Sequence, residues 1–185
     1  MRSAILLIVL SLFCVSVSLA QSPNDGKIQA NAYVNSYLKI SYACPKILTP
    51  VDTSALHLGS PSARGDEFLL FSARQGDEPF GVVILAEKLK VPTPHTKGIQ
   101  DAADFMARVK RGFDPAGNWK KLAETHITNV DGIPIDELDY TIFGEYDSAV
   151  VAQVGDFLVV FKCNAKSASD LAEMTGSAIA LHRVK

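Results

Sequence analysis

The sequence predicts an α+β fold in which helices pack on an antiparallel β-sheet, an αβα sandwich. Four segments of strand composition follow one another between residues 121 and 163, joined by short turns rich in glycine and aspartate. Two earlier segments, residues 67–73 and 80–86, are apolar on both faces, as central strands are. Two amphipathic helical segments stand beside these runs of strands rather than alternating with each strand, which favours α+β over α/β.

Length and composition favour one folded domain, which we place at residues 32–185. The chain has 185 residues, of which 48% are hydrophobic and 21% are charged. This content is too apolar for a disordered chain and too poor in charge for a coiled coil. The formal net charge of -2, from 18 basic and 20 acidic residues, argues against a nucleic-acid partner bound through phosphate neutralisation.

The first part of the chain, residues 1–20, has the features of a secretory signal peptide. Arg2 provides a basic start, residues 4–15 form an apolar stretch, and Ser18-Leu19-Ala20 is a small-residue cleavage site. We therefore expect cleavage before Gln21 and an extracytoplasmic protein, periplasmic or secreted, with no stable membrane span.

Two alternatives to cleavage stay open. The first is an uncleaved membrane anchor, because the apolar run up to Ala20 is just long enough to cross a bilayer. The second is lipidation at Cys14, which the bulky Phe13 disfavours. Residues 21–31 are polar, with proline, asparagine and glycine, and are expected to form a flexible leader.

Strand signals begin directly after this leader. Residues 32–44 are expected to be a strand region, because apolar and polar residues alternate along their second half. Its apolar face consists of Leu38, Ile40, Tyr42 and Cys44. Residues 46–58 carry no clear signal. The turns at residues 63–68 and 73–80 resemble each other and suit either ordinary tight turns or a pair of anion-binding loops.

A first helix is expected at residues 97–111. Apolar side chains recur there near helical spacing, Thr96 can cap its start, and Gly112 suits the residue after its end. Its last turn carries three cations, Arg108, Lys110 and Arg111. They can compensate the helix dipole or form a patch for an anionic ligand, and dipole compensation is the simpler explanation.

An antiparallel meander and a second helix complete the expected domain. The strands are expected at residues 121–130, 133–143, 148–154 and 157–163, with Pro134 near a strand start or on an edge. The C-terminal helix begins with a capping box from Ser167 to Asp170. Its apolar face consists of Leu171, Met174, Ala178 and Leu181.

Three stretches of this pattern resemble a known family. They are the aromatic segment at residues 33–42, the central strand pair that leads into a helix, and residues 155–161 followed by a helix start at residues 167–171. Together they resemble the PsbP-like and DcrB-like superfamily of αβα sandwich domains, over most of residues 32–182. The resemblance implies an exported, non-enzymatic accessory or envelope protein, and it assigns no functional residue.

Common motifs for catalysis and metal binding are missing from the sequence. It has no H-E-x-x-H, G-x-S-x-G, G-x-G-x-x-G, Walker or C-x-x-C motif. The four histidines are far apart in sequence: His57, His95, His126 and His182. We therefore predict no catalytic, cofactor-binding or metal-binding residue, and no cofactor.

Acidic residues in and after the first meander turn are the remaining candidates for chemistry. Glu137 and Asp139 share one strand face, about 7 Å apart, with Asp131 and Asp136 nearby. They can bind calcium or a carbohydrate, act as an acid–base pair, or belong to a solvated face. We favour the solvated face, because acids in water lack the burial that raises a carboxyl pKa. Trp119 is expected in the core or as a lid rather than stacked on a sugar.

A disulfide is expected between Cys44 and Cys163. Each lies at the end of an expected strand and on its apolar face, and export permits oxidation. Both thiols would point into one core if the two strands are neighbours in one sheet, with Cα atoms within about 7 Å. The alternative is two separate buried thiols.

Two functions are compatible with these features. The favoured one is an exported, non-catalytic accessory or binding domain of the cell envelope, whose partner is an envelope protein or a small ligand. The alternative is a small secreted hydrolase that uses acidic residues or a His–acid pair. It requires Glu137, Asp139 or His126 to converge in a deep pocket.

Overall fold

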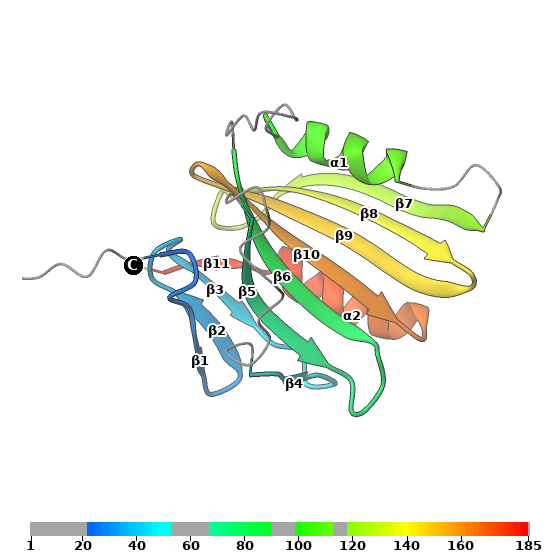
Figure 1. Cartoon of the computed structure of the whole chain (residues 1–185), viewed down its shortest axis with the longest axis horizontal. Coiled ribbons are helices and arrows are strands. Elements are labelled where there is room, and N and C mark those ends of the chain that lie inside the picture. The colour runs from blue at the N-terminus through cyan, green and yellow to red at the C-terminus, as the bar shows by residue number, and fades with distance from the viewer. Residues whose placement is uncertain (1–21, 53–66, 90–98, 113–117, 185) are drawn as a thin grey trace, which may run out of the picture.

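The computed structural model describes residues 22–52, 67–89, 99–112 and 118–184 (Figure 1). The expected signal peptide, residues 63–66 of the first of the two similar turns, His57, His95 and Thr96 lie outside the described residues. Within the described part, the strands form two antiparallel sheets and two helices cover the larger one. No helix in these four ranges is long and apolar enough to cross a membrane.

The large sheet has seven strands in the order β4-β5-β6-β10-β9-β8-β7. Their bounds are β4 (Thr49–Pro50), β5 (Glu67–Arg74), β6 (Gly81–Lys88), β10 (Phe157–Ala165), β9 (Glu145–Val154), β8 (Pro134–Ile142) and β7 (Trp119–Thr128). The last four strands form the expected antiparallel meander. Strand β10 also pairs with β6, which joins the meander to the β5–β6 hairpin far away in sequence.

The turn between β8 and β9 is shorter than the sequence suggested. Only Phe143 and Gly144 separate the two strands, and both have positive φ, 51° and 89°, as a two-residue type I′ hairpin requires. Phe143 is 80% exposed at the tip. Because β9 starts at Glu145, Asp147 belongs to a strand rather than to the expected turn.

The small sheet contains β1 (Lys27–Gln29), β2 (Ala32–Asn35), β3 (Ile40–Ala43) and β11 (His182–Arg183), in the order β1-β2-β3-β11. The expected strand region is therefore a hairpin of β2 and β3, turned where the Oδ1 of Asn35 accepts the N–H of Leu38 at 2.9 Å.

The leader expected at residues 21–31 differs from the structure, because β1 lies inside it and pairs with β2. Asn35 explains part of this order. Its side chain is fully buried, and its amide donates to the carbonyl oxygen of Pro23 at 2.7 Å. A buried polar group needs such a partner, so Asn35 anchors the chain before β1.

Both helices begin at a side chain that caps the first turn. Helix α1 (Ala102–Arg111) starts later than expected, and its cap is Asp101, which accepts the N–H of Asp104 at 2.8 Å. Helix α2 (Ala168–Ile179) starts as expected, because Ser167 accepts the N–H of Asp170 at 3.2 Å.

The helices lie on opposite faces of the large sheet, as the αβα prediction requires (Figure 1). Helix α1 packs over a core of Leu138, Val151, Leu158 and Val160. Helix α2 and the small sheet share the other face, where Tyr42 contacts the rings of Phe71 and Phe161 at centroid distances of 5.7 and 5.3 Å.

The expected disulfide is corrected to two separate buried thiols. Cys44 and Cys163 lie in one core, at 4% and 2% exposure, but both are free. Cys44 directly follows β3 of the small sheet, whereas Cys163 is in β10 of the large sheet. The two strands thus belong to facing sheets, which pack about 10 Å apart, whereas a disulfide needs Cα atoms within about 7 Å.

Candidate functional site

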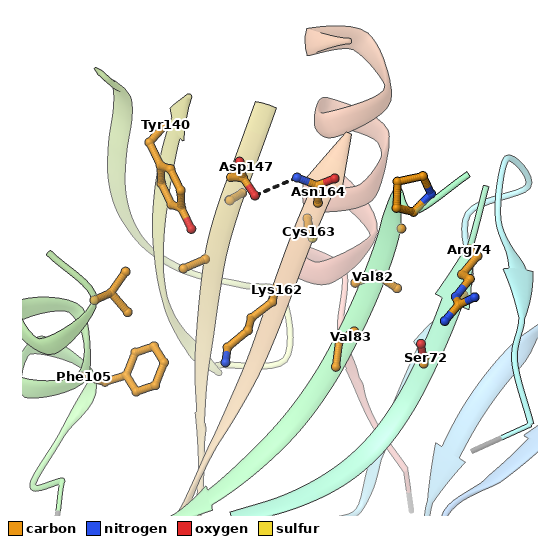
Figure 2. Close-up of a pocket in the computed structure, with 16 residues that line it drawn as sticks. Ser72, Arg74, Val82, Val83, Phe105, Tyr140, Asp147, Lys162, Cys163 and Asn164 are labelled. Carbon is orange, nitrogen blue, oxygen red and sulfur yellow. Dashed lines mark hydrogen bonds between the residues drawn. The ribbon is translucent and has the colours of Figure 1, made fainter. Parts of the chain in front are cut away.

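A groove lies on the α1 side of the large sheet, with a volume of about 360 Å³ (Figure 2). Figure 2 shows Phe105 of α1 at one end, Arg74 of β5 at the other, and strands β6, β10 and β9 between them. The apolar wall of α1 therefore faces a floor made of strand residues.

The strand register places five groove residues in one row across the sheet. From β8 to β5 the row consists of Tyr140, Asp147, Asn164, Gly81 and Arg74. Residues opposite one another on antiparallel strands share a face, so these side chains are all on the α1 side. A Cβ at Gly81 would lie 2.1 Å from the carbonyl oxygen of Ala73. Glycine is thus required there, and the floor stays open between Asn164 and Arg74.

A second row runs parallel to the first, closer to the centre of the sheet. It consists of Leu138, Ala149, Lys162, Val83 and Ser72. Lys162 is exposed, whereas Ser72 is only 7% exposed. The two rows together combine an acid, two cations, an amide and two hydroxyl groups with apolar surface from Val83, Ala149 and α1.

Asp147 and Asn164 form the polar centre of the groove. The Nδ2 of Asn164 donates to the Oδ1 of Asp147 at 2.9 Å. Partial burial raises the pKa of the Asp147 carboxyl, the nearby Glu145 raises it further, and the hydrogen bond from Asn164 opposes both. The Asp147 carboxyl is thus held beside the Asn164 amide, which has a second N–H and its oxygen left for further hydrogen bonds.

Tyr140 lies next to this pair in the first row. Burial is the main cause that raises the pKa of its hydroxyl to about 12, with Asp147 and Cys163 contributing. Its ring centroid is 6.3 Å from that of Trp119. The only tryptophan of the chain therefore packs on a groove residue.

An ion pair fixes the helix that forms the apolar wall. The Nη2 of Arg108 lies 2.7 Å from both carboxylate oxygens of Glu87, which is 8% exposed on β6. Burial raises the pKa of Glu87, although Arg108 opposes the shift. Arg108 also lies over the ring of Phe105, 5.2 Å from its centroid. These contacts hold Phe105 at the groove.

The cations of α1 and those of the groove differ in their partners. Arg108 pairs with Glu87, and Lys110 pairs with Glu124 of β7, so two of the three cations in the last turn of α1 are ion-paired. Lys162 and Arg74 are exposed, and neither has a carboxylate within ion-pair distance among the described residues. The unpaired positive charge therefore belongs to the groove and not to those two helix residues.

Glu137 and Asp139 are not on a solvated face, which corrects the prediction. They point to the α2 side, opposite to the groove, and both are partly buried. Burial raises the pKa of Glu137, Asp139 adds to the shift, and a hydrogen bond with Thr175 of α2 opposes it. One oxygen of Asp139 is buried without a hydrogen-bond partner. The pair belongs to the contact between β8 and α2.

Two histidines form contacts with acids, but outside the groove. The Nδ1 of His126 lies 2.7 Å from Asp136, and that of His182 lies 3.2 Å from Asp131. Their side chains are 71% and 55% exposed, and neither histidine lines the groove. His126 and Glu137 are on opposite faces of the sheet, so the convergence that the hydrolase requires is not observed among the described residues.

Metal binding finds no support in the same part of the chain. No group of three or more His, Cys, Asp or Glu side chains in the described ranges is placed to hold an ion. The Asp147–Asn164 pair faces Tyr140 and not a second carboxylate in its row. The arrangement in the groove therefore fits hydrogen bonding and charge recognition.

The architecture matches a solved structure in spite of low sequence similarity. The chain is similar to cyanobacterial PsbP (CyanoP) from Synechocystis sp. PCC 6803, solved in solution, with a TM-score of 0.54 and 17% identity. The match covers 92% of this chain and 96% of that chain. The chain has a PsbP-like fold. No protein-family model matches it, and no curated protein sequence does.

Sequence reasoning did not find the groove residues. Asp147 was expected in a turn, and Asn164 fell outside every expected element. One signal was available: Lys162 and Asn164 interrupt an otherwise apolar strand at alternate positions. A strand that is buried on both faces is apolar throughout, so two alternating polar residues indicate that one face is open. That signal marks one open face but does not show which distant residues share it.

Proposed function

We propose that this chain is an exported, non-catalytic binding or accessory domain of the cell envelope, and that the groove beside α1 is its binding site. The observation that carries the proposal is that Lys162 and Arg74, with no carboxylate within ion-pair distance among the described residues, line the same groove as the partly buried Asp147–Asn164 pair. A groove of about 360 Å³ is within the size range of small-ligand sites. It equally accepts a side chain of a partner protein.

Three further features support this proposal. The first twenty residues have a signal-peptide pattern. The fold is PsbP-like, and the sequence resemblance to that superfamily implies an exported accessory protein. The two His–acid pairs are exposed and away from the groove, and no nucleophile is bonded to either histidine in the described part of the chain.

Export is tested on the native protein by cell fractionation and mass spectrometry. We expect an extracytoplasmic protein whose first residue is Gln21, because Ser18-Leu19-Ala20 is the cleavage site. Intact residues 1–20 on a native cytoplasmic protein would refute the export part of the proposal. A native protein that keeps residues 1–20 and is found in the membrane fraction would instead support the uncleaved membrane anchor.

Binding is tested by affinity capture from the native envelope, followed by native mass spectrometry of what is bound. We compare the natural chain with the double variant R74E/K162E, which reverses the two groove cations. A matched control, K27E/K120E, reverses two exposed lysines that do not line the groove. A molecule captured by the natural chain and the control but lost by the groove variant supports the proposal. Equal capture by all three proteins refutes the groove as the site.

A further inference from the structure

We infer that the groove binds a hydroxylated organic carboxylate of the sugar-acid class, through Arg74 at its carboxylate and the Asp147–Asn164 pair at its hydroxyl groups, with Lys162 adding positive charge to the floor. This inference rests on the proposed function, since it assigns a ligand class to the same site. It is carried by the charge, the hydrogen-bonding capacity and the dimensions of the groove.

The charge of the groove indicates an anionic group. Its charged lining residues within the described ranges are Arg74, Lys162 and Asp147, so cations outnumber acids. Neither cation has a carboxylate within ion-pair distance there, whereas Arg108 and Lys110 are both paired. A guanidinium binds a carboxylate through two parallel hydrogen bonds, which makes Arg74 the anchor of the carboxylate. Lys162, on β10, points toward Phe105 (Figure 2) and adds positive charge to the groove rather than a second contact beside Arg74.

The hydrogen-bonding groups at the other end indicate hydroxyl groups rather than a second anion. The bond between Asn164 and Asp147 uses one carboxylate oxygen and one N–H. One more oxygen of Asp147, the amide oxygen of Asn164 and its second N–H stay available. A hydroxyl group both donates and accepts, so neighbouring hydroxyl groups match such a mixed set, whereas a carboxylate beside Asp147 would be repelled. Ser72 adds a hydroxyl in the second row.

The dimensions of the groove fit one or two sugar rings. Asp147 and Arg74 are on strands three positions apart in the sheet, β9 and β5, which corresponds to roughly 14 Å at a strand spacing of ~4.8 Å. The long side chain of Arg74 shortens the span that a ligand must cross. Between them, Gly81 leaves the floor open, and Val83 and Phe105 offer apolar surface for the C–H face of a ring.

Calorimetric titration of the chain from Gln21 with three probes separates these contributions. D-glucuronate has both a carboxylate and hydroxyl groups, D-glucose lacks the carboxylate, and cyclohexanecarboxylate lacks the hydroxyl groups. We expect D-glucuronate to bind at least about tenfold more tightly than either other probe, because only it uses both ends of the groove.

Groove variants then assign each end. R74Q/K162Q should reduce D-glucuronate affinity about tenfold or more, to the level of D-glucose, while K27Q/K120Q leaves it unchanged. D147A should weaken D-glucuronate but not cyclohexanecarboxylate. Circular dichroism of each variant checks that it is folded. We expect the cation variants to fold, because all four substituted cations are exposed.

Three results would overturn the inference. Equal affinity for D-glucuronate and D-glucose would show that the groove does not recognise the carboxylate. Equal affinity for D-glucuronate and cyclohexanecarboxylate would show that it does not recognise the hydroxyl groups. Absence of D-glucuronate binding at millimolar concentration would remove the ligand class. The proposed binding domain would survive that last result if envelope capture still depends on Arg74 and Lys162, so the two failures are distinguishable.

Discussion

The two faces of the large sheet differ in how completely they are covered. On one face, α2 and the small sheet enclose an aromatic core in which Tyr42, Phe71 and Phe161 are at most 1% exposed. On the other, the ten-residue helix α1 covers only part of the sheet (Figure 1). The groove is lined by residues of α1 and of the strands beside it. The covered face stabilises the fold, and the part that neither described helix covers is where strand side chains can meet a ligand.

The largest effect is expected from truncation on the covered face. Phe161→Ala should lower the free energy of unfolding by about 3–5 kcal/mol, because a fully buried ring leaves a cavity between the two sheets. Val83→Ala in the groove floor, which is only partly buried, should cost about 1 kcal/mol or less. Urea unfolding of both variants measures the difference, and equal losses would contradict the contrast between the faces.

The next effect concerns the ion pair that holds α1. Arg108→Ala leaves Glu87 buried without its partner and should cost about 2–3 kcal/mol at neutral pH, below a fully buried pair because Arg108 is partly exposed.

This loss should depend on pH. Burial already raises the pKa of Glu87 in the folded state, and removing Arg108 raises it further. An acid with a raised folded pKa binds more protons when folded, so stability falls as pH rises through the window above its ordinary pKa. The cost of Arg108→Ala should therefore be smaller near pH 5 than near pH 8, and Glu87→Gln should largely remove that dependence. Urea unfolding at the two pH values checks this, and a cost independent of pH would count against the buried ion pair.

A smaller effect is expected at Glu137, on the α2 side. Burial raises its pKa, so the charged carboxylate costs stability once the pH exceeds the ordinary glutamate value. Glu137→Gln should then be up to about 1 kcal/mol more stable than the natural chain at pH 8, with a smaller difference at pH 4. Chemical unfolding at both pH values checks this, with the exposed Glu78→Gln as control. The same difference at pH 4 and pH 8 would return Glu137 to a solvated face.

The smallest effect is expected from reduction of the cysteines. Because both thiols are free and buried, a reducing agent should change the free energy of unfolding by less than about 0.5 kcal/mol. Burial raises the pKa of Cys44 to about 11 and raises that of Cys163 as well, so neither should react with a thiol reagent in the native chain. Both should react after unfolding without reductant. Failure to detect them would restore the disulfide.

Local sequence patterns predicted the parts of the fold that depend on neighbouring residues. The meander of β7 to β10 and the cap at Ser167 were found because turn residues, period-two alternation and capping act within a few residues. The start of α1 was placed too early, because apolar spacing continues past the true cap at Asp101. The N-terminal strand β1 was missed, because it forms by pairing with β2, and the contact between Asn35 and Pro23 that anchors the chain before it is one that no local pattern indicates.

The candidate site could not be predicted in the same way. Its row joins residues 74, 81, 140, 147 and 164, which meet only because β10 pairs with both β9 and β6. Glu137 and Asp139 were placed correctly on one strand face, but the sequence does not show that α2 covers that face.

The sequence by itself determined the two helices, the central strands β5 and β6, the order of the meander strands β7 to β10 and the alternation of side chains along them, but not the short strands β1, β4 and β11. Only the tertiary structure decided that β3 and β10 lie in separate sheets, that Cys44 and Cys163 stay apart, and that α1 leaves Asp147 and Lys162 accessible. The physical reason is the range of the interactions. Hydrogen-bonded turns and caps act between near neighbours, whereas sheet pairing and burial depend on which distant apolar faces meet.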